Sequence, residues 1–278
     1  MIEFKTLDNF SIKELTAAFN EGFSDYVVKF NATEEYLDHR WKGARVRYEY
    51  SAGMLLNGHL KGILVHGIDD WNGKKTAFNC ATCVAPAARG NAFTARAYDF
   101  LMPMLHEIGI EQMALEVIQS NTKAVKVYEK VGFGINRDLK CLRGAIQAPT
   151  IATANAWTFR QLDEIPSPAW LYYEPTWENM SHAIRANPAI HETFAVIEEK
   201  AVLAYTVVEK ARKRIKQLFI DPNHRTAGVG EYLFQHLSIQ YPEIDIVNVP
   251  DMAKEDLALL RKIGLEDYIA QFEMCRKI

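Results

Sequence analysis

The chain has 278 residues, of which 49% are hydrophobic and 24% are charged, and its formal net charge is −3 at pH 7. This length favours two domains, and the composition is that of a soluble globular protein. The weakly acidic balance provides no overall attraction to nucleic acid or to an anionic membrane. No stretch has the ~20 consecutive apolar residues of a membrane-spanning helix, and the opening MIEFKTLDNF is unlike a signal peptide. We therefore expect a cytoplasmic protein without a nucleic-acid or membrane partner.

The first 84 residues predict a strand, two helices and three antiparallel strands. Ser11 and Thr33 are good N-cap residues for the two helices. The dipeptide Asn-Gly occurs twice between apolar runs, which predicts two tight hairpins because both turn residues need a positive φ. The predicted elements are a strand over residues 3–7, helices over 11–23 and 33–42, and strands over 52–56, 60–68 and 75–84.

Cys80 and Cys83 form a C-x-x-C pair in the last of these strands. A redox pair needs its first cysteine at a helix N-terminus, where the thiol pKa falls. A strand instead sends the two side chains to opposite faces. Cys141 and Cys275 are isolated, so a second pair of zinc ligands is absent from the sequence. We therefore interpret these cysteines as buried structural residues and expect no metal site.

A strand, a loop with arginine and glycine, and a helix follow one another around residues 84–94, which read VAPAARGNAFT. The backbone N–H groups of such a loop and the positive end of the helix dipole both point at a bound anion. The helix that follows has one apolar side and a natural stop at Gly109. This order predicts a phosphate site, with an ordinary strand–helix loop as the alternative.

The stretch LEVIQSNTKAVKVYEKVGF, residues 115–133, combines a strand, a helix cap, a helix and a stop. Asn121 is a good N-cap residue, and Gly132 stands where a helix commonly ends. Helical spacing places Tyr128 on the inner, apolar face of this helix. The stretch therefore predicts a strand–helix unit that directs one tyrosine inward.

These motifs closely resemble the acyl-CoA-binding half of the GNAT superfamily of N-acetyltransferases. In that family a strand ending in LEV leads to a helix with the pattern N-x-x-A-x-x-x-Y-E-K-x-G-F, matched here by Asn121, Ala124, Tyr128, Glu129, Lys130, Gly132 and Phe133. The resemblance implies an α/β (α+β) fold with a mixed, mostly antiparallel central sheet flanked by helices. It also implies that an acetyl group moves from acetyl-CoA to a primary amine by direct attack in a ternary complex. The acceptor would be a small molecule or a peptide.

The resemblance also assigns cofactor contacts. The R-x-x-G-x-G/A loop of the family corresponds to residues 89–94, where Ala92 and Thr94 replace the two small positions. Ala92 adds a methyl group where the backbone must approach the phosphate closely. Asn121 matches the position that contacts the cofactor. The implied cofactor-binding residues of the first half are Val84, Arg89, Gly90, Asn91, Ala92, Phe93, Thr94 and Asn121.

Tyr128 matches the family tyrosine that protonates the departing CoA thiolate, with a hydrogen-bonded core tyrosine as the alternative. A backbone N–H of the strand before the phosphate loop would stabilise the oxyanion. That strand has no carboxylate, so the general base stays open. Glu116 on the next strand is a candidate, although it could equally face solvent. His66 is a weaker candidate, and deprotonation through water would need neither residue.

A strand over residues 135–144 is expected to close the first half. The second half repeats the order of elements and is expected to close with a strand over residues 272–275. Residues 146–155 are poor in charge, contain Pro149 and predict a linker between domains at 1–145 and 156–278. The predicted elements are strands over 157–162, 194–197, 201–208, 215–220, 244–247 and 272–275, a helix over 177–186, and a helix that begins near residue 229.

A complete R-x-x-G-x-G follows the fourth of these strands, and Leu260 stands where the first half has Tyr128. A dinucleotide-binding loop would instead need G-x-G-x-x-G and an acidic residue after the next strand. The phosphate-loop residues predicted for the second half are Arg225, Ala227, Gly228, Val229 and Gly230.

The whole chain thus resembles a tandem GNAT protein, as in the mycothiol synthase group, in a monomer or a homodimer. We expect catalysis in the first half, with the second half binding CoA without turnover or shaping the acceptor cleft. Two alternatives stay open, namely catalysis in the second half and a sensor that binds acyl-CoA but catalyses nothing. Phe23, Tyr26 and Phe30 could form an apolar wall for the acceptor or pack in the core.

Overall fold

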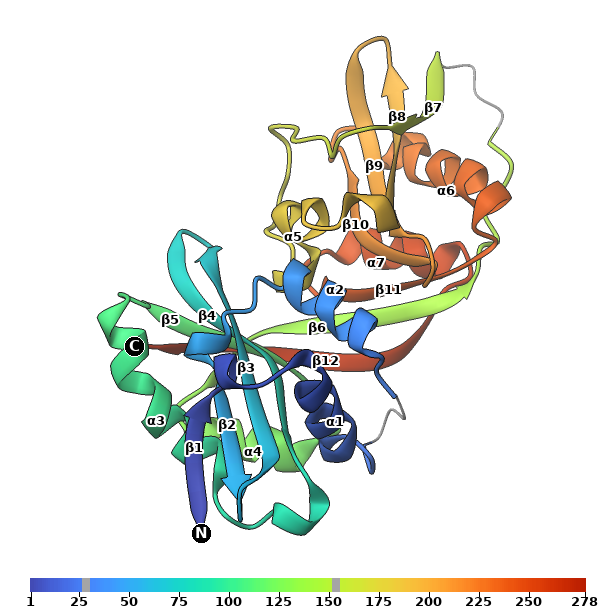
Figure 1. Ribbon diagram of the computed structural model, residues 1–278. Helices are drawn as coiled ribbons and strands as arrows, with labels where there is room; N and C mark the ends of the chain where they lie inside the picture. Colours follow the sequence, from blue (N-terminus) through green and yellow to red (C-terminus); the bar gives the residue numbers. More distant parts are fainter. Residues whose placement is uncertain (27–30, 152–155) are drawn as a thin grey trace. The chain divides into compact units, whose positions relative to one another are not determined.

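A computed structural model describes residues 1–26, 31–151 and 156–278 of the chain (Figure 1). The chain forms two compact units, and each has a sheet flanked by helices, which confirms the predicted fold class. Unit 1 comprises Met1–Asn136 and Glu273–Ile278, and unit 2 comprises Arg137–Phe272. These bounds differ from the predicted domains at 1–145 and 156–278. Of the predicted linker, residues 152–155 lie outside the described residues.

The helices and strands of unit 1 follow the predicted order. They are β1 (Ile2–Thr6), α1 (Ile12–Gly22), α2 (Glu34–Gly43), β2 (Ala52–Leu56), β3 (His59–Trp71), β4 (Lys74–Val84), α3 (Phe93–Glu107), β5 (Gln112–Ile118) and α4 (Thr122–Lys130). The strands lie in the order β1-β2-β3-β4-β5. Neighbours are antiparallel except β4 and β5, which are parallel.

Both hairpins form as the Asn-Gly signals predict. Asn57 and Gly58 have φ values of 52° and 81°, and Asn72 and Gly73 have φ values of 52° and 70°. Each pair of positive φ values gives a two-residue turn whose twist matches that of the flanking strands. The turns therefore fix the register of the meander that ends in β4.

Helices cover both faces of the unit 1 sheet, and two glycines allow them to approach it. A Cβ at Gly22 of α1 would lie 2.5 Å from Sγ of Cys83, which pairs with Ile63. A Cβ at Gly62, the neighbour of Ile63, would lie 3.2 Å from the ring of Phe93 in α3. Because adjacent strand residues face opposite sides of a sheet, α1 and α3 cover opposite faces.

Unit 2 contains the remaining elements, except that residues 134–136 of β6 and residues 273–277 of β12 belong to unit 1. They are β6 (Gly134–Ala145), β7 (Trp157–Leu162), α5 (Ser181–Arg185), β8 (His191–Glu198), β9 (Ala201–Glu209), β10 (Arg214–Ile220), α6 (Val229–Gln240), β11 (Glu243–Pro250), α7 (Lys254–Lys262) and β12 (Glu266–Lys277). The strands of this unit lie in the order β7-β8-β9-β10-β11-β6. Neighbours are antiparallel except β10 and β11, which are parallel, so the unit repeats the pattern of unit 1.

Two predictions about the closing strands are wrong. The sequence predicts that residues 135–144 close the first half and residues 272–275 close the second. In the structure β6 continues into unit 2 and pairs with β11, whereas Glu273–Ile278 at the end of β12 belongs to unit 1. The prediction followed the rule that consecutive elements are usually neighbours in space. A strand pattern identifies a strand but does not specify the sheet edge that it joins.

The predicted helix over residues 177–186 is also shorter than expected. The segment begins with a 3-10 turn, η4 (Trp177–Asn179), and Met180 then has an extended backbone with φ −64° and ψ 148°. Only Ser181–Arg185 forms an α-helix, α5. The extended residue interrupts the helical hydrogen bonds that the apolar pattern suggested.

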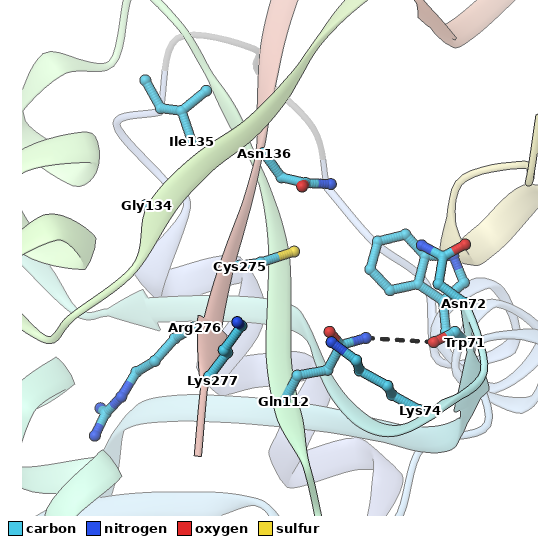
Figure 2. A pocket seen from close by; sticks show the side chains of 10 residues that line it. All are labelled: Trp71, Asn72, Lys74, Gln112, Gly134, Ile135, Asn136, Cys275, Arg276 and Lys277. Carbon is cyan, nitrogen blue, oxygen red and sulfur yellow. Dashed lines mark hydrogen bonds between the residues drawn. The ribbon is translucent and has the colours of Figure 1, made fainter.

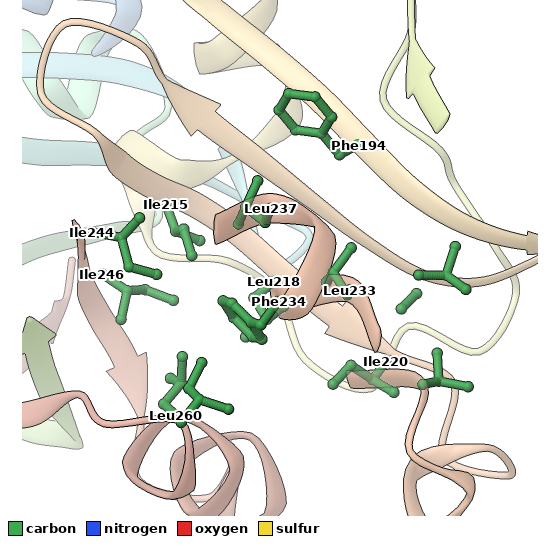
Figure 3. Close-up of a cluster of buried hydrophobic side chains, with 14 of the residues drawn as sticks. Phe194, Ile215, Leu218, Ile220, Leu233, Phe234, Leu237, Ile244, Ile246 and Leu260 are labelled. Carbon is green, nitrogen blue, oxygen red and sulfur yellow. The ribbon is translucent and has the colours of Figure 1, made fainter. Parts of the chain in front are cut away.

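The core of unit 2 lies between its sheet and the helices α6 and α7 (Figure 3). Leu233, Phe234 and Leu260 are fully buried there, against aliphatic residues of β10 and β11. Gly230 lets α6 pack tightly, because a Cβ at this position would lie 2.4 Å from Cδ2 of Leu259. No helix among the described residues is both long and apolar enough to cross a membrane.

Gly230→Ala should destabilise unit 2 because the added methyl group has no room between α6 and α7. We expect the free energy of unfolding to fall by about 1–3 kcal/mol, the usual cost of overpacking. Urea unfolding followed by circular dichroism measures this change. Gly134→Ala is the matched control, since a Cβ at Gly134 meets no atom within 4 Å. Equal stability of the two variants would contradict the tight contact.

Candidate active site

The parallel strand pair of unit 1 separates before either strand ends. The last parallel pair joins Asn79 to Leu115, although β4 runs on to Val84 and β5 runs on to Ile118. At the same level the register of β4 with β3 shifts, and Cys80 is the extra residue of this β-bulge. Backbone groups that would have paired across these strands therefore need other partners. The predicted site residues Val84 and Glu116 lie on these two strands beyond the last parallel pair.

The loop after β4 leads into α3 with the geometry of an anion site. Ala92 is the N-cap residue of α3 and has φ 51° and ψ 37°, in the left-handed region that favours glycine. Its side chain makes no capping hydrogen bond, whereas Asn121 accepts a bond from the backbone N–H of Ala124 at the start of α4. The first N–H groups of a helix have no partner within the helix. Those of α3 are therefore available to a phosphate.

The Arg89 side chain is engaged by partners in β4 and at the end of α1. Its Nη1 and Nη2 each donate to a carboxylate oxygen of Asp25 at 2.6 Å. Its Nε donates to the Val84 carbonyl oxygen at 3.2 Å, and Nη2 also donates to the Gly22 carbonyl oxygen at 3.3 Å. The guanidinium holds the pKa of Asp25 below its usual value through the hydrogen bond. Arg89 therefore ties the loop to the end of α1, and its charge is already compensated.

Tyr128 on α4 directs its hydroxyl toward β4 near the last parallel pair. It is half-buried on α4, beside the polar side chains of Thr82 and Asn79 on β4. Burial raises the pKa of Tyr128 to about 12, so the phenol keeps its proton at neutral pH. The structure thus brings a protonated hydroxyl next to the strand that precedes the phosphate loop.

The two candidate bases have different environments. Glu116 is half-buried on β5, directly after the last parallel pair. His66 is fully buried, its Nδ1 lies 2.9 Å from the Tyr50 carbonyl oxygen, and burial lowers the pKa of His66 to about 4. A histidine that stays neutral and enclosed is suited to a structural role. Glu116 is therefore the better placed of the two.

The structure also describes the surroundings of the cysteines of β4 and of two of the aromatic residues near α1. Cys80 and Cys83 are both buried, and burial raises the pKa of the Cys83 thiol to about 12. Phe23 and Tyr26 contact each other edge to face at 5.1 Å, whereas Phe30 lies outside the described residues. No group of three or more His, Cys, Asp or Glu side chains in the described ranges is placed to hold a metal ion.

Unit 2 repeats the backbone framework of this site. β10 and β11 pair in parallel only as far as Ile215 opposite Ile246, and the register of β10 with β9 shifts around Lys216. Gly228 is the N-cap residue of α6 and has φ 90° and ψ 13°. It therefore has the left-handed conformation that Ala92 has in unit 1.

In unit 2, however, protein side chains fill the space between the separated strands. The amide Nδ2 of Asn179 in η4 donates to the Val247 carbonyl oxygen at 3.3 Å. The Asn179 carbonyl oxygen accepts a bond from Gln217 Nε2 at 2.6 Å. The cavity left beside these residues has a volume of about 10 Å³, which admits at most one water molecule. The segment around η4 thus occupies the position that corresponds to the end of the parallel pair in unit 1.

The arginine of the complete R-x-x-G-x-G motif is also engaged within unit 2. Arg225 lies over the ring of Tyr172 at 4.2 Å, and its Nη2 is 3.9 Å from Oδ1 of Asp256 in α7. The Tyr172 hydroxyl donates to the other oxygen of Asp256. A Cβ at Gly228 would meet Ile151, which precedes the part of the linker outside the described residues, at 3.9 Å. The arginine of this loop therefore already has partners within unit 2.

The described part of unit 1 also contains a polar pocket of about 400 Å³ (Figure 2). Lys74 at the start of β4 and Gln112 at the start of β5 line it, together with Cys275 of β12. Because the phosphate loop follows the other end of β4, this pocket is separate from the predicted cofactor site. None of the predicted site residues lines it.

Sequence analysis missed three residues that contact the site. Asn79, Thr82 and Tyr98 join their side chains by hydrogen bonds beside Tyr128. One signal was present, since Asn79 places a carboxamide in the middle of an apolar strand, where an unpaired amide is costly. The partners of this amide come from β4 and α3, and spacing along the sequence did not identify them.

Comparisons with known proteins were consistent with this geometry. The family model described as "Acetyltransferase (GNAT) family" matches residues 13–133. Comparison with curated proteins gives no match. Among solved structures, a putative acetyltransferase from Pyrococcus horikoshii is 13% identical, with a TM-score of 0.67 over 100% of this chain and 89% of that chain. A GCN5-related N-acetyltransferase from Sphaerobacter thermophilus is 11% identical, with a TM-score of 0.68 over 99% of this chain and 95% of that chain.

A third similar structure concerns the arrangement of two units in one polypeptide. It is a tandem GNAT protein from the clavulanic acid biosynthesis pathway, 12% identical, with a TM-score of 0.65 over 100% of this chain and 98% of that chain. At these low identities the likeness concerns the fold alone. It supports a tandem organisation, because the match extends over both units.

Ala92→Gly should stabilise the protein, because it relieves the left-handed strain at the start of α3. We expect a gain of up to about 1 kcal/mol in the free energy of unfolding, reduced by the greater freedom of glycine in the unfolded chain. Ala95→Gly, inside the same helix, should instead cost about 0.5–1 kcal/mol. Thermal unfolding of both variants measures the difference. A loss of stability in both would contradict the strain at Ala92.

Asp256 should make the stability of unit 2 fall as the pH rises. Burial raises the pKa of Asp256 to about 6, above the ~3.9 of an unfolded aspartate. Between these values the folded state binds more protons than the unfolded state, so raising the pH favours unfolding. Two pKa units correspond to roughly 3 kcal/mol. Urea unfolding at pH values from about 4.5 to about 7, a range that covers most of the interval between the two pKa values, measures this slope. Asp256→Asn should remove it. Asn substitution at the exposed Asp251 should leave the slope unchanged, and a flat wild-type profile would disprove the prediction.

Proposed function

We propose, from the match of residues 13–133 to the GNAT acetyltransferase family, that unit 1 moves an acetyl group from acetyl-CoA to a primary amine. The amine attacks directly while both substrates are bound. One observation carries the proposal: in unit 1 the Tyr128 hydroxyl lies against β4 just past the last parallel pair. In unit 2 the corresponding position is filled by η4 and has Leu260 in place of a tyrosine.

The cofactor phosphates would bind at the start of α3. Backbone N–H groups of residues 90–94 would donate to the pyrophosphate, favoured by the helix dipole. Val84 and Arg89 would hold the loop in place through the bond between their carbonyl oxygen and guanidinium, without a direct role for the arginine charge. Asn121 caps α4 with its side chain, which is half-buried. We infer that the exposed part of this side chain contacts the pantetheine chain.

The thioester would lie between β4 and β5 beyond Asn79, where these strands cease to pair. A backbone N–H of β4 near the bulge at Cys80 would stabilise the oxyanion that forms when the amine attacks. Tyr128 would then give its proton to the sulfur as the carbon–sulfur bond breaks. Its pKa of about 12 favours this direction, because the phenol is protonated before the reaction begins.

The amine must lose a proton before or during attack. Glu116 is the side chain best placed to accept it, since it lies directly after the last parallel pair on β5. The alternative is transfer through water to solvent. The acceptor itself is a small molecule or peptide amine, and the sequence gives no finer identity.

Unit 2 would then bind no CoA and would have a structural role. Arg225 is held by Tyr172 and Asp256, and Gly230 packs against Leu259. Ala227, Gly228 and Val229 would accordingly form a packing loop and not a phosphate site. This reading favours unit 1 over the alternative in which unit 2 is catalytic.

The location of the cofactor is tested by placing one carboxylate in each loop. Asn91→Glu in unit 1 should weaken acetyl-CoA binding about tenfold or more, because the new charge lies beside the bound phosphates. Ala227→Glu is the matched control, since Ala227 is the equivalent exposed position in unit 2 and its substitution should leave affinity unchanged. Calorimetric titration with acetyl-CoA measures both.

The reverse result, loss of affinity in Ala227→Glu alone, would move the cofactor to unit 2 and away from Tyr128. Binding without CoA release in the presence of a broad panel of amines would favour the sensor over the enzyme. Release of CoA that depends on an amine of the panel would support transfer.

A further inference from the structure

The polar pocket of unit 1 has the size of a small-molecule site and no role in the proposed reaction. Its volume of about 400 Å³ is within the range of ~300–1,000 Å³ that is usual for ligand sites. The strands β3, β4, β5, β6 and β12 each reach it with one end (Figure 2). At ~3.3 Å per residue, Lys74 at the start of β4 lies about 30 Å from Val84 at its end. An occupant of this pocket is therefore a different molecule from the proposed cofactor.

The charged side chains that line the pocket are all cations. They are Lys74, Arg276 and Lys277, and no aspartate or glutamate of the described ranges lines it. Arg276 donates from Nη1 to the Val131 carbonyl oxygen at 2.7 Å and extends away from Lys277 in Figure 2. The ammonium groups of Lys74 and Lys277 have no ion pair or hydrogen bond with any described residue. The two lysines therefore provide positive charge without an internal counter-ion.

One carboxylate lies near the pocket without lining it. Glu273 of β12 is fully buried and accepts a hydrogen bond at 2.7 Å from Nδ2 of Asn136, which does line the pocket. Glu273 reduces the positive charge in this region, but it pairs with neither lysine. Two lysines against one buried carboxylate leave the surroundings of the pocket positive.

Gln112 adds a buried carboxamide with a fixed orientation. It is only 7% exposed, and its Nε2 donates to the Trp71 carbonyl oxygen at 3.3 Å and to Thr76 Oγ1 at 2.9 Å. These bonds use both N–H groups of the amide. Its Oε1 accepts no hydrogen bond from the part of the chain that the structure describes. A buried acceptor in a pocket lining needs a donor, so the occupant should carry a hydroxyl or N–H group.

The type of cation in the pocket favours phosphate over carboxylate. A lysine binds phosphate as a point charge, whereas a carboxylate is matched best by the planar fork of an arginine. The fork of Arg276 is already engaged by Val131. A phosphate monoester carries a charge of about −1.5 to −2 at pH 7, which suits two lysines.

We propose that this pocket binds a small phosphate monoester that carries a hydroxyl group. Lys74 and Lys277 donate to the phosphate oxygens, and Oε1 of Gln112 accepts from the hydroxyl. This site does not depend on the proposed function of unit 1, because it shares no residue with the candidate active site.

Cys275 reports occupation of the pocket without an activity assay. It lines the pocket and is half-buried, whereas Cys80, Cys83 and Cys141 are buried. Alkylation of the native chain by iodoacetamide should therefore occur at Cys275, and a bound ligand should slow it. Each rate is compared with that of the same variant without ligand, so that changes in thiol reactivity cancel.

The test measures alkylation of Cys275 by mass spectrometry at increasing glycerol 3-phosphate, up to about 10 mM, which would fill even a weak specific site. We expect saturable protection. Lys74→Gln and Lys277→Gln should each raise the concentration for half-protection about tenfold, the usual loss for one charge-assisted hydrogen bond. Lys75→Gln is the matched control and should change nothing. It removes the same charge from the next residue of β4, whose Nζ donates to the Ile108 carbonyl oxygen at 2.5 Å outside the pocket lining.

Three further compounds test the class of ligand. Glycerate replaces the phosphate by a carboxylate, propyl phosphate lacks the hydroxyl groups, and both should protect less well than glycerol 3-phosphate. Equal protection by glycerate would overturn the preference for phosphate, and equal protection by propyl phosphate would overturn the contact with Gln112. CoA should not protect, and protection by CoA would overturn the separation from the cofactor site. No saturable protection, or equal weakening in Lys75→Gln, would overturn the pocket as a binding site and leave the proposed function standing.

Discussion

The separation of the parallel pair β4 and β5 beyond Asn79 is the constraint on which the candidate site depends. A parallel sheet normally continues its hydrogen bonds to the strand ends, so leaving the ladder early exposes backbone groups that need partners. The β-bulge at Cys80 turns the backbone at the same level. The loop that follows then starts α3 in a left-handed conformation, with its first N–H groups uncapped. One backbone irregularity thus lies at the centre of the site that we propose for the thioester and the phosphates.

The two units show that a shared backbone framework does not carry the chemistry by itself. Both units have a separated parallel pair, a bulge and a left-handed residue before the helix. In unit 1 the space beside these features receives a tyrosine hydroxyl, whereas in unit 2 it receives Asn179 and its hydrogen bonds. The complete motif lies in the unit whose arginine is held by Tyr172 and Asp256. The more complete sequence motif therefore lies in unit 2, whereas the better candidate site lies in unit 1.

Burial determines the protonation of the key groups in both units. It keeps Tyr128 protonated and His66 neutral in unit 1, and it raises the pKa of Asp256 in unit 2. The difference lies in the partners. Tyr128 lies beside the polar side chains of Thr82 and Asn79, and its burial keeps the phenol neutral. Asp256 instead accepts a hydrogen bond from Tyr172 and lies near Arg225. These contacts hold the segment around Tyr172 against α7. The raised pKa of Asp256 makes the stability of unit 2 depend on pH.

The sequence by itself determined what depends on neighbours along the chain. The two Asn-Gly turns, the caps at Ser11, Thr33 and Asn121, and the helix that carries Tyr128 are set by local φ and ψ preferences and by periodicity. It also carried the resemblance to the GNAT family, whose model matches residues 13–133. Tertiary structure alone decided the exchange of closing strands, the pairing of Arg89 with Asp25, and the filling of unit 2 by η4. These features join segments that are distant in sequence. Local preferences do not distinguish among the possible partners of such segments, so packing and hydrogen bonding in the folded chain determine them.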